Sequence, residues 1–120
     1  MRLYISNNPS LVGYYHSGLP GFNNHEPEIT ISEWCFKWPT ISAYVLLHEM
    51  GHHKLHGKRL IPGIVETEHE ADLYAMERCG KKATMTVLRF LSIYSKKLNI
   101  DNPEVKEELK KRLELIKEVK

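Results

Sequence analysis

The residues His48, Glu49 and His52 form the pattern H-E-x-x-H near the middle of the 120-residue chain. On an α-helix, residues four positions apart lie one turn apart on the same face, so both imidazoles can direct ring nitrogens at one metal ion. Glu49 is rotated by about 100° from His48, which puts its carboxylate beside the ion rather than on it. A base that takes a proton from an attacking water must sit there. The pattern therefore predicts a metal centre with an adjacent general base.

The spacing has this meaning only on a helix, and the flanking residues predict one. A continuous apolar run from Tyr44 to Leu47 precedes the motif, as in a helix buried against a sheet. Pro39 and Thr40 favour a helix start, and Gly57 favours a stop. The alternative is a surface helix that is rich in histidine by chance.

The N-terminal third of the chain predicts strands. Residues 2–6 and 11–16 read as two short strands with a turn between them, followed by a loop that is rich in Gly, Pro and Asn. Polar and apolar residues then alternate in a strand with one buried face: Glu28, Ile29, Thr30, Ile31 and Ser32. Because this strand directly precedes the motif helix, we expect an edge strand along a cleft, able to bind an extended peptide by main-chain hydrogen bonds. It could equally be the outer strand of a small sheet.

The remaining residues predict helices at 64–79, at about 83–98 and at 103–119. The expected fold is α+β, with a small antiparallel sheet of about three strands packed on the H-E-x-x-H helix and on a glutamate-rich helix. We expect a compact domain at residues 1–102 and an amphipathic helix at 103–120. The metal site does not need this last helix. Its apolar stripe could pack on the domain, form a homodimer, or cover the cleft and keep an enzyme latent.

Composition indicates one globular domain. Apolar residues make up 42% and charged residues 27% of the chain, and no apolar run approaches the length of a membrane span. The first residues lack the apolar stretch of a signal peptide, so we expect a cytoplasmic protein that does not bind membranes. Cys35 and Cys79 are expected to be reduced thiols, and neither belongs to a C-x-x-C pair.

Charge is distributed unevenly, with a net charge of −3 in residues 1–80 and of +5 in residues 81–120. A basic region of this kind can indicate nucleic-acid binding. Here the basic residues are mixed with glutamates, which favours the solvated surface of a helix. We therefore expect no nucleic-acid partner.

A catalytic zinc site needs a third protein ligand besides His48 and His52. The candidates are His56, His69 and the acids of the following helix. His53 would point away from the ion, and His56 lies a further turn along, so both are expected to be surface or capping residues. In the following helix, two pairs of acids share a face, Glu66 with Glu70 and Glu68 with Asp72. One carboxylate could bind the metal while another orients a ligand imidazole, but spacing does not choose between the pairs.

The motif together with the run Glu68-His69-Glu70-Ala71-Asp72 resembles the H-E-x-x-H … E-x-x-A-D signature of gluzincin zinc metallopeptidases. The chain is most similar to the short minigluzincins, and also to the catalytic cores of CAAX-prenyl and HtpX-like peptidases, whose spanning helices it lacks. The ImmA/IrrE-type regulatory peptidases share the pattern. The resemblance implies one Zn²⁺ per protomer with Glu68 as third ligand, and Asp72 supporting a ligand histidine. It also implies that the strand at 28–32 binds substrate.

The resulting expectation is a zinc-dependent endopeptidase that acts on peptides or proteins, with Glu49 as general base. An oxyanion needs a further donor, for which Tyr74, His69 and Tyr94 are candidates. The competing interpretation is a zinc-stabilised module without catalysis that binds a protein partner through its basic C-terminal region. Three ligands beside a glutamate favour catalysis, since structural sites have four protein ligands.

Overall fold

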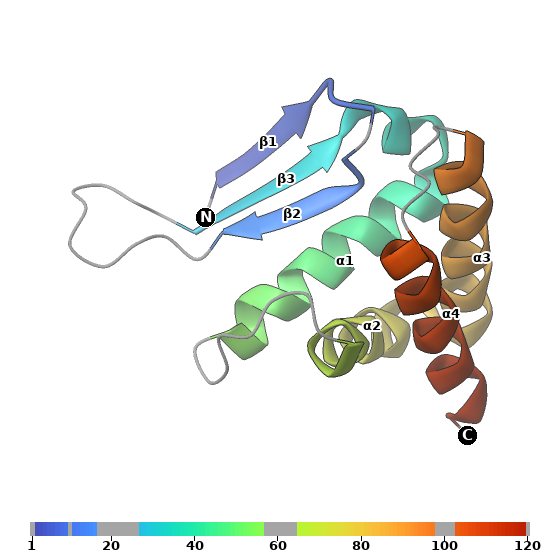
Figure 1. The fold of residues 1–120 in the computed structure, drawn as a ribbon. Coiled ribbons are helices and arrows are strands. Elements are labelled where there is room, and N and C mark those ends of the chain that lie inside the picture. The colour runs from blue at the N-terminus through green and yellow to red at the C-terminus, as the bar shows by residue number, and fades with distance from the viewer. Residues whose placement is uncertain (1, 10, 17–26, 57–64, 98–102, 120) are drawn as a thin grey trace.

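The computed structural model describes residues 2–9, 11–16, 27–56, 65–97 and 103–119, and all structural statements below concern these residues. They form three strands, β1 (Arg2–Ser6), β2 (Gly13–His16) and β3 (Glu28–Ser32), and a short 3₁₀ helix, Glu33–Lys37. Four α-helices follow: α1 (Pro39–His56), α2 (Val65–Cys79), α3 (Lys81–Lys97) and α4 (Pro103–Glu118). The predicted α+β class is confirmed: in Figure 1 the sheet lies over α1, α2 lies on the opposite side of α1, and α3 and α4 lie to the right of the sheet and α1.

The strand order is β1-β3-β2, with β1 parallel and β2 antiparallel to β3. The sheet is thus mixed rather than antiparallel, and β3 is its central strand, so the prediction of an edge strand at 28–32 was wrong. The reason is burial: Ile29 and Ile31 are each 1% exposed and face the core, whereas Leu3 and Ile5 of β1 remain largely exposed. The strand with the buried face takes the centre of the sheet, and β1 and β2 pair with its two edges.

Helix α1 begins at Pro39 as predicted and buries Ile41, Tyr44 and Val45 in the core. Beyond them, α1 approaches α2 at Gly51. A Cβ atom at Gly51 would lie 3.0 Å from Tyr74 Cβ and 3.1 Å from Ala71 Cα. The small residues Gly51 and Ala71 therefore let the two helices pack closely where the H-E-x-x-H motif faces the acids of α2.

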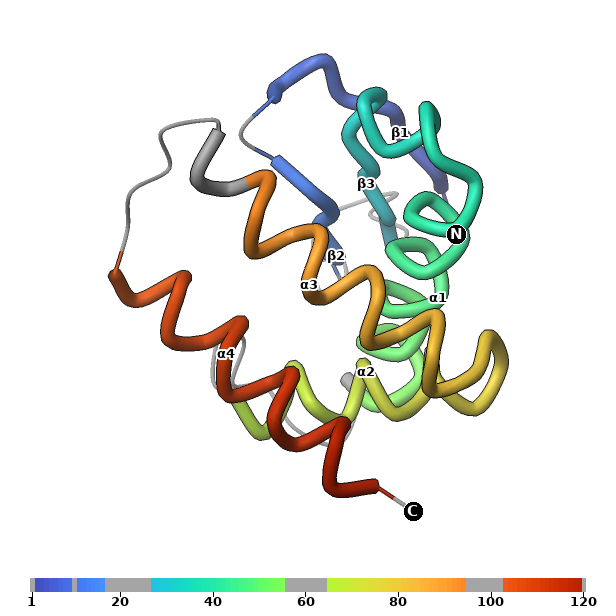
Figure 2. The backbone as a smooth tube through the Cα atoms, turned by 90° about the vertical axis from the view of Figure 1, so that its right-hand side faces the viewer, coloured from blue at the N-terminus to red at the C-terminus, as the bar shows by residue number. Residues whose placement is uncertain are grey.

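Helix α4 packs against α2 and α3 (Figure 2). It buries Leu109, Arg112 and Ile116 on one face. At its C-terminal end, Lys81 of α3 donates hydrogen bonds from Nζ to the carbonyl oxygens of Lys117, at 2.9 Å, and of Val119. The sequence left three positions open for this helix: packed on the domain, in a homodimer, or over the cleft. In the structure it packs on the domain, against α2 and α3.

Cys35 is buried and Cys79 half-buried, and both are free thiols, as predicted. Within the described part of the chain, no helix combines the length and apolar character that a membrane span requires.

Candidate metal centre

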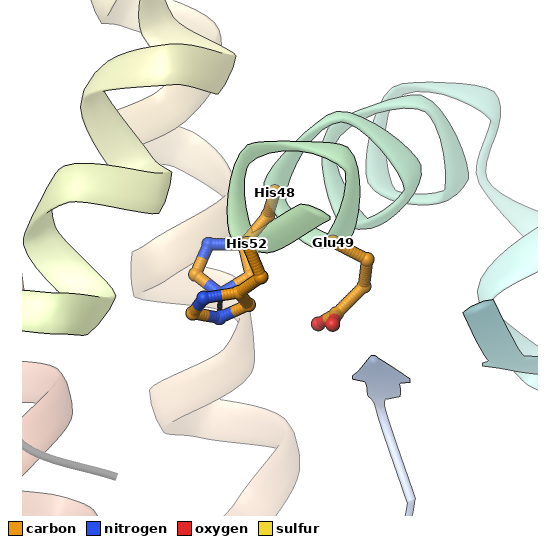
Figure 3. Close-up of side chains that lie close together, drawn as sticks. All are labelled: His48, Glu49 and His52. Atoms are coloured by element: carbon orange, nitrogen blue, oxygen red, sulfur yellow. Dashed lines mark hydrogen bonds between the residues drawn. The ribbon is translucent and has the colours of Figure 1, made fainter. Parts of the chain in front are cut away.

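Three side chains on α1 come together in a group that can hold a metal ion. His48, Glu49 and His52 each offer one donor atom, and these atoms lie within 4.8 Å of one another. The two imidazoles project from the same face of α1, and the Glu49 carboxylate lies beside them (Figure 3). This arrangement is what the helical spacing of the motif predicted.

Helix α2 brings a fourth donor atom, a carboxylate oxygen of Glu68, next to this group. Glu68 Oε2 lies 2.9 Å from His48 Nε2 and 3.3 Å from His52 Nε2, and the two Nε2 atoms are 3.1 Å apart. Ligand atoms bound tetrahedrally at about 2.0–2.1 Å from a zinc ion lie roughly 3.3 Å from one another. The three atoms therefore form a triangle of the size that one such ion needs.

The protonation pattern of these groups also favours a cation. His48 donates from Nδ1 to Asp72 Oδ1 at 2.9 Å, so in the neutral ring its Nε2 carries a lone pair. That lone pair faces Glu68 and His52, whose nearest atoms are an acceptor oxygen and a second ring nitrogen. Such a convergence of acceptors needs a positive charge between them, either a proton or a metal ion.

The pKa values of the metal-free cluster also indicate that a positive charge is stabilised between these groups. Burial alone would lower the pKa of His48, but hydrogen bonds to Asp72 and Glu68 outweigh it and raise the pKa to about 9. Burial alone would raise the pKa of Glu68, yet the hydrogen bonds from His48 and His52 hold it well below its ordinary value. Without a metal ion, therefore, a proton on His48 neutralises the cluster.

Asp72 is fully buried and stands behind His48 in this network. Its carboxylate receives hydrogen bonds from His48, from the Tyr44 hydroxyl and from Arg112 of α4, whose Nε and Nη2 both lie 2.9 Å away. Burial alone would raise the pKa of Asp72, but the Arg112 guanidinium and the His48 hydrogen bond hold it well below its usual range. Sequence reasoning missed both Tyr44 and Arg112. The available signal was a charged residue at position 112 within the apolar stripe formed by Leu109 and Ile116.

Glu49 is 5% exposed, and burial raises the pKa of its carboxyl group. Strand β2 comes close to it at Gly13, where a Cβ atom would lie 3.2 Å from Glu49 Oε1 and 2.6 Å from Val45 Cγ1. The absence of a side chain at position 13 therefore leaves the space that Glu49 occupies.

The candidate metal-binding group lines a pocket of about 340 Å³. Its polar lining includes His48, Glu49, His52 and Glu68. Much of the remaining lining is apolar or aromatic and comes from β2 and the residues before it, the 3₁₀ helix, α3 and α4: Val12, Gly13, Tyr14, Tyr15, Trp34, Leu91, Tyr94, Val105 and Leu109. Residues of β3 do not line it, so the strand that borders the pocket is β2 and not the predicted strand at 28–32.

The other side chains singled out in the sequence lie around this pocket or away from it. His53 Nδ1 is 2.9 Å from the Tyr15 hydroxyl, and His69 Nδ1 is buried without a hydrogen-bond partner among the described residues. The Arg78 guanidinium carbon lies over the Tyr74 ring, 3.4 Å from the ring centroid. Tyr94, the one oxyanion candidate that lines the pocket, stacks on Trp34 with ring centroids 4.2 Å apart. The His56 side chain lies outside the described residues.

Comparisons of the chain with protein-family models, with curated proteins and with solved structures returned no match.

Proposed function

We propose that the chain is a zinc-dependent peptidase of the gluzincin type, with His48, His52 and Glu68 as the metal ligands and Glu49 as general base. One observation carries the proposal: three donor atoms from α1 and α2 lie 2.9–3.3 Å apart with a buried carboxylate beside them. The resemblance of the two sequence motifs to those of minigluzincins supports the same assignment.

The donor set favours zinc. Two imidazole nitrogens and one carboxylate oxygen are the protein ligands of one class of catalytic zinc sites, in which the fourth position stays open. A zinc ion bound there would polarise a substrate carbonyl and lower the pKa of a water molecule. Asp72 holds His48 in the tautomer that leaves Nε2 free for the metal, which is the usual role of a carboxylate behind a ligand histidine.

Glu49 supplies the proton transfers in this proposal. It takes a proton from the attacking water and passes it to the leaving amine. Burial raises the pKa of the Glu49 carboxyl group. A higher pKa lies closer to neutral pH and makes the carboxylate a better proton acceptor. Gly13 matters here because any larger residue would press on this carboxylate.

The substrate that fits this site is an extended peptide lying along β2. One edge of β2 pairs with β3, and the strand borders the pocket through Gly13, Tyr14 and Tyr15. An extended chain that pairs with an available strand edge gains main-chain hydrogen bonds without regard to its sequence. Both edges of β3, the strand at 28–32, are already paired with neighbouring strands. We therefore assign the binding of an extended peptide, first expected of β3, to β2.

The competing function is a zinc-stabilised module without catalysis. It gains support from the position of Glu49, which belongs to the group of side chains that can contact one ion. If Glu49 were a fourth ligand, the site would be closed and structural. The distinction is testable because a ligand and a base respond differently to the same substitution.

The decisive experiment measures zinc per protomer and peptide hydrolysis in wild type, Glu68→Ala and Glu49→Gln. Glu66→Ala is the matched control, since Glu66 lies exposed on the same helix. We expect about one zinc in the wild type, in Glu66→Ala and in Glu49→Gln, much less in Glu68→Ala, and hydrolysis only in the wild type and Glu66→Ala. Loss of zinc in Glu49→Gln would favour the structural module, and a wild type that takes up no zinc would refute the proposal.

A further inference from the structure

Asp72 determines how the His48 ring is oriented. The carboxylate is fully buried on α2, and its Oδ1 accepts the Nδ1–H of His48 at 2.9 Å. The opposite ring nitrogen faces Glu68 and His52. Any rotation of the Asp72 carboxylate therefore turns the imidazole whose Nε2 completes the triangle of donor atoms.

Arg112 fixes that carboxylate from a helix far away in the sequence. Its Nε donates to Oδ2 and its Nη2 to Oδ1, each at 2.9 Å, in the two-pronged geometry that guanidinium and carboxylate groups form best. Among the contacts of the described residues, Arg112 provides the donor to Oδ2, while His48 and Tyr44 both bind Oδ1. Without Arg112, the carboxylate would be held through one oxygen and could rotate, because the last torsion of an aspartate side chain is soft.

Arg112 is itself held by the way α4 docks. It is 8% exposed and lies between Leu109 and Ile116 on the buried face of the helix. Its Nη1 is 3.4 Å from Glu108 Oε1, so the third side of the guanidinium also has a partner. The position of the His48 ring thus depends on a helix that contributes no donor atom to the triangle.

We propose that Arg112 is a positioning residue of the metal centre, which acts through Asp72 to fix the His48 ring and makes α4 an integral part of the site. The inference rests on the proposed function in that it treats His48 as a metal ligand. A buried ion pair can also have a purely structural role, because removing one partner leaves the other charge buried without compensation and destabilises the fold. What distinguishes this pair is that the anchored carboxylate is bonded to a candidate ligand.

The test is a double-mutant cycle on zinc affinity, measured by competition with a chromophoric chelator on wild type, Asp72→Asn, Arg112→Met and the double variant. Loss of a partner behind a metal ligand typically weakens affinity by about 10- to 100-fold, and we expect this of each single variant. If Arg112 acts through Asp72, the double variant should bind zinc about as weakly as Asp72→Asn alone. Additive losses, or an unchanged affinity in Arg112→Met, would overturn the proposal.

Two further variants separate positioning from stability. Ile116→Ala removes a fully buried contact of α4 without touching Asp72, so it should lower the Tm and leave the zinc Kd within about twofold. Arg112→Lys keeps the positive charge opposite Asp72 but cannot make the paired hydrogen bonds to both carboxylate oxygens. It replaces Arg112→Met in the test if that variant does not fold. We expect Arg112→Lys to weaken zinc binding by roughly tenfold. If zinc affinity follows the Tm equally in all these variants, Arg112 has only a structural role.

A readout without metal distinguishes failure of this inference from failure of the proposed function. In the metal-free protein, the His48 Nδ1–H should give a downfield NMR signal protected from solvent exchange in the wild type and in Ile116→Ala, but not in Arg112→Met. If this holds while the wild type takes up no zinc, the peptidase proposal fails and the positioning role stands. If the wild type binds zinc and Arg112→Met keeps both the affinity and the signal, the positioning role fails alone.

Discussion

The α1–α2 pair and helix α4 contribute to the same site in different ways. The pair supplies the donor atoms, and these are placed by close packing at Gly51 and Ala71. Helix α4 supplies apolar wall residues and one guanidinium that contacts Asp72. The pair therefore decides which chemistry is available, whereas α4 decides how rigidly the groups are held. Variants in the two regions should differ in kind as well as in size.

The largest expected effect comes from the α1–α2 pair, in the Glu49→Gln variant. Removing a general base while keeping the side chain's shape should lower kcat by about 10²- to 10⁴-fold, with zinc content unchanged. Steady-state hydrolysis of a fluorogenic peptide, together with metal analysis, checks this. Substantial turnover in Glu49→Gln would assign the proton transfers to another group and remove the contrast between the two regions.

The second effect is on the stability of the metal-free protein, and it tests whether the charges of the pair are coupled. The pKa of His48 is raised from 6.5 to about 9, so its contribution is full below pH 6.5 and disappears as the pH rises through about 9, a loss of roughly 3 kcal/mol. The pKa values of Glu68 and Asp72 are lowered, so their contributions are present above about pH 4 and fall away in stronger acid.

Metal-free protein should therefore be most stable between about pH 4.5 and 6.5 and should lose stability toward pH 9. Urea unfolding in the presence of a chelator at several pH values measures this. Zinc should act in the opposite sense and raise the Tm more at pH 8 than at pH 6, because it competes with the proton for His48 Nε2. A metal-free stability that does not change between pH 6 and 9 would contradict the protonated cluster.

The sequence predicted the part of the site that depends on local spacing. The positions of His48, Glu49 and His52 follow from one helical turn, and the placement of Glu68 opposite them agrees with the expected helix at 64–79. The strand order and Arg112 were missed because they depend on tertiary contacts. Which strand occupies the centre is decided by the burial of Ile29 and Ile31, and the role of Arg112 by where α4 docks.

A third, smaller effect separates β2 from β3. In Gly13→Val the new side chain would meet Val45 and Glu49, and we expect activity to fall by tenfold or more, since small misplacements at a reacting centre are costly. Thr30→Val is the matched change on β3, at a residue that pairs with Tyr14 and does not line the pocket. Its activity should stay within about twofold of the wild type. If Gly13→Val and Thr30→Val lost activity equally, substrate binding would have to be assigned to the central strand β3 instead.

The smallest effect concerns the wall that α4 provides. Val105 is half-buried and lines the pocket, so Val105→Ala should widen the pocket beside α4 without touching Arg112 or the donor atoms. One missing methylene-sized contact in an apolar pocket changes discrimination by about 10- to 200-fold, and we expect about tenfold here because Val105 is only half-buried. We therefore expect kcat/KM to fall for peptides with a bulky apolar side chain beside the cleaved bond and to stay constant for peptides with alanine there. The zinc Kd should not change, because the wall and the guanidinium act on different parts of the site. If Val105→Ala weakened zinc binding as much as Arg112→Met, α4 would act as one packed unit, and its wall and positioning roles would not be separable.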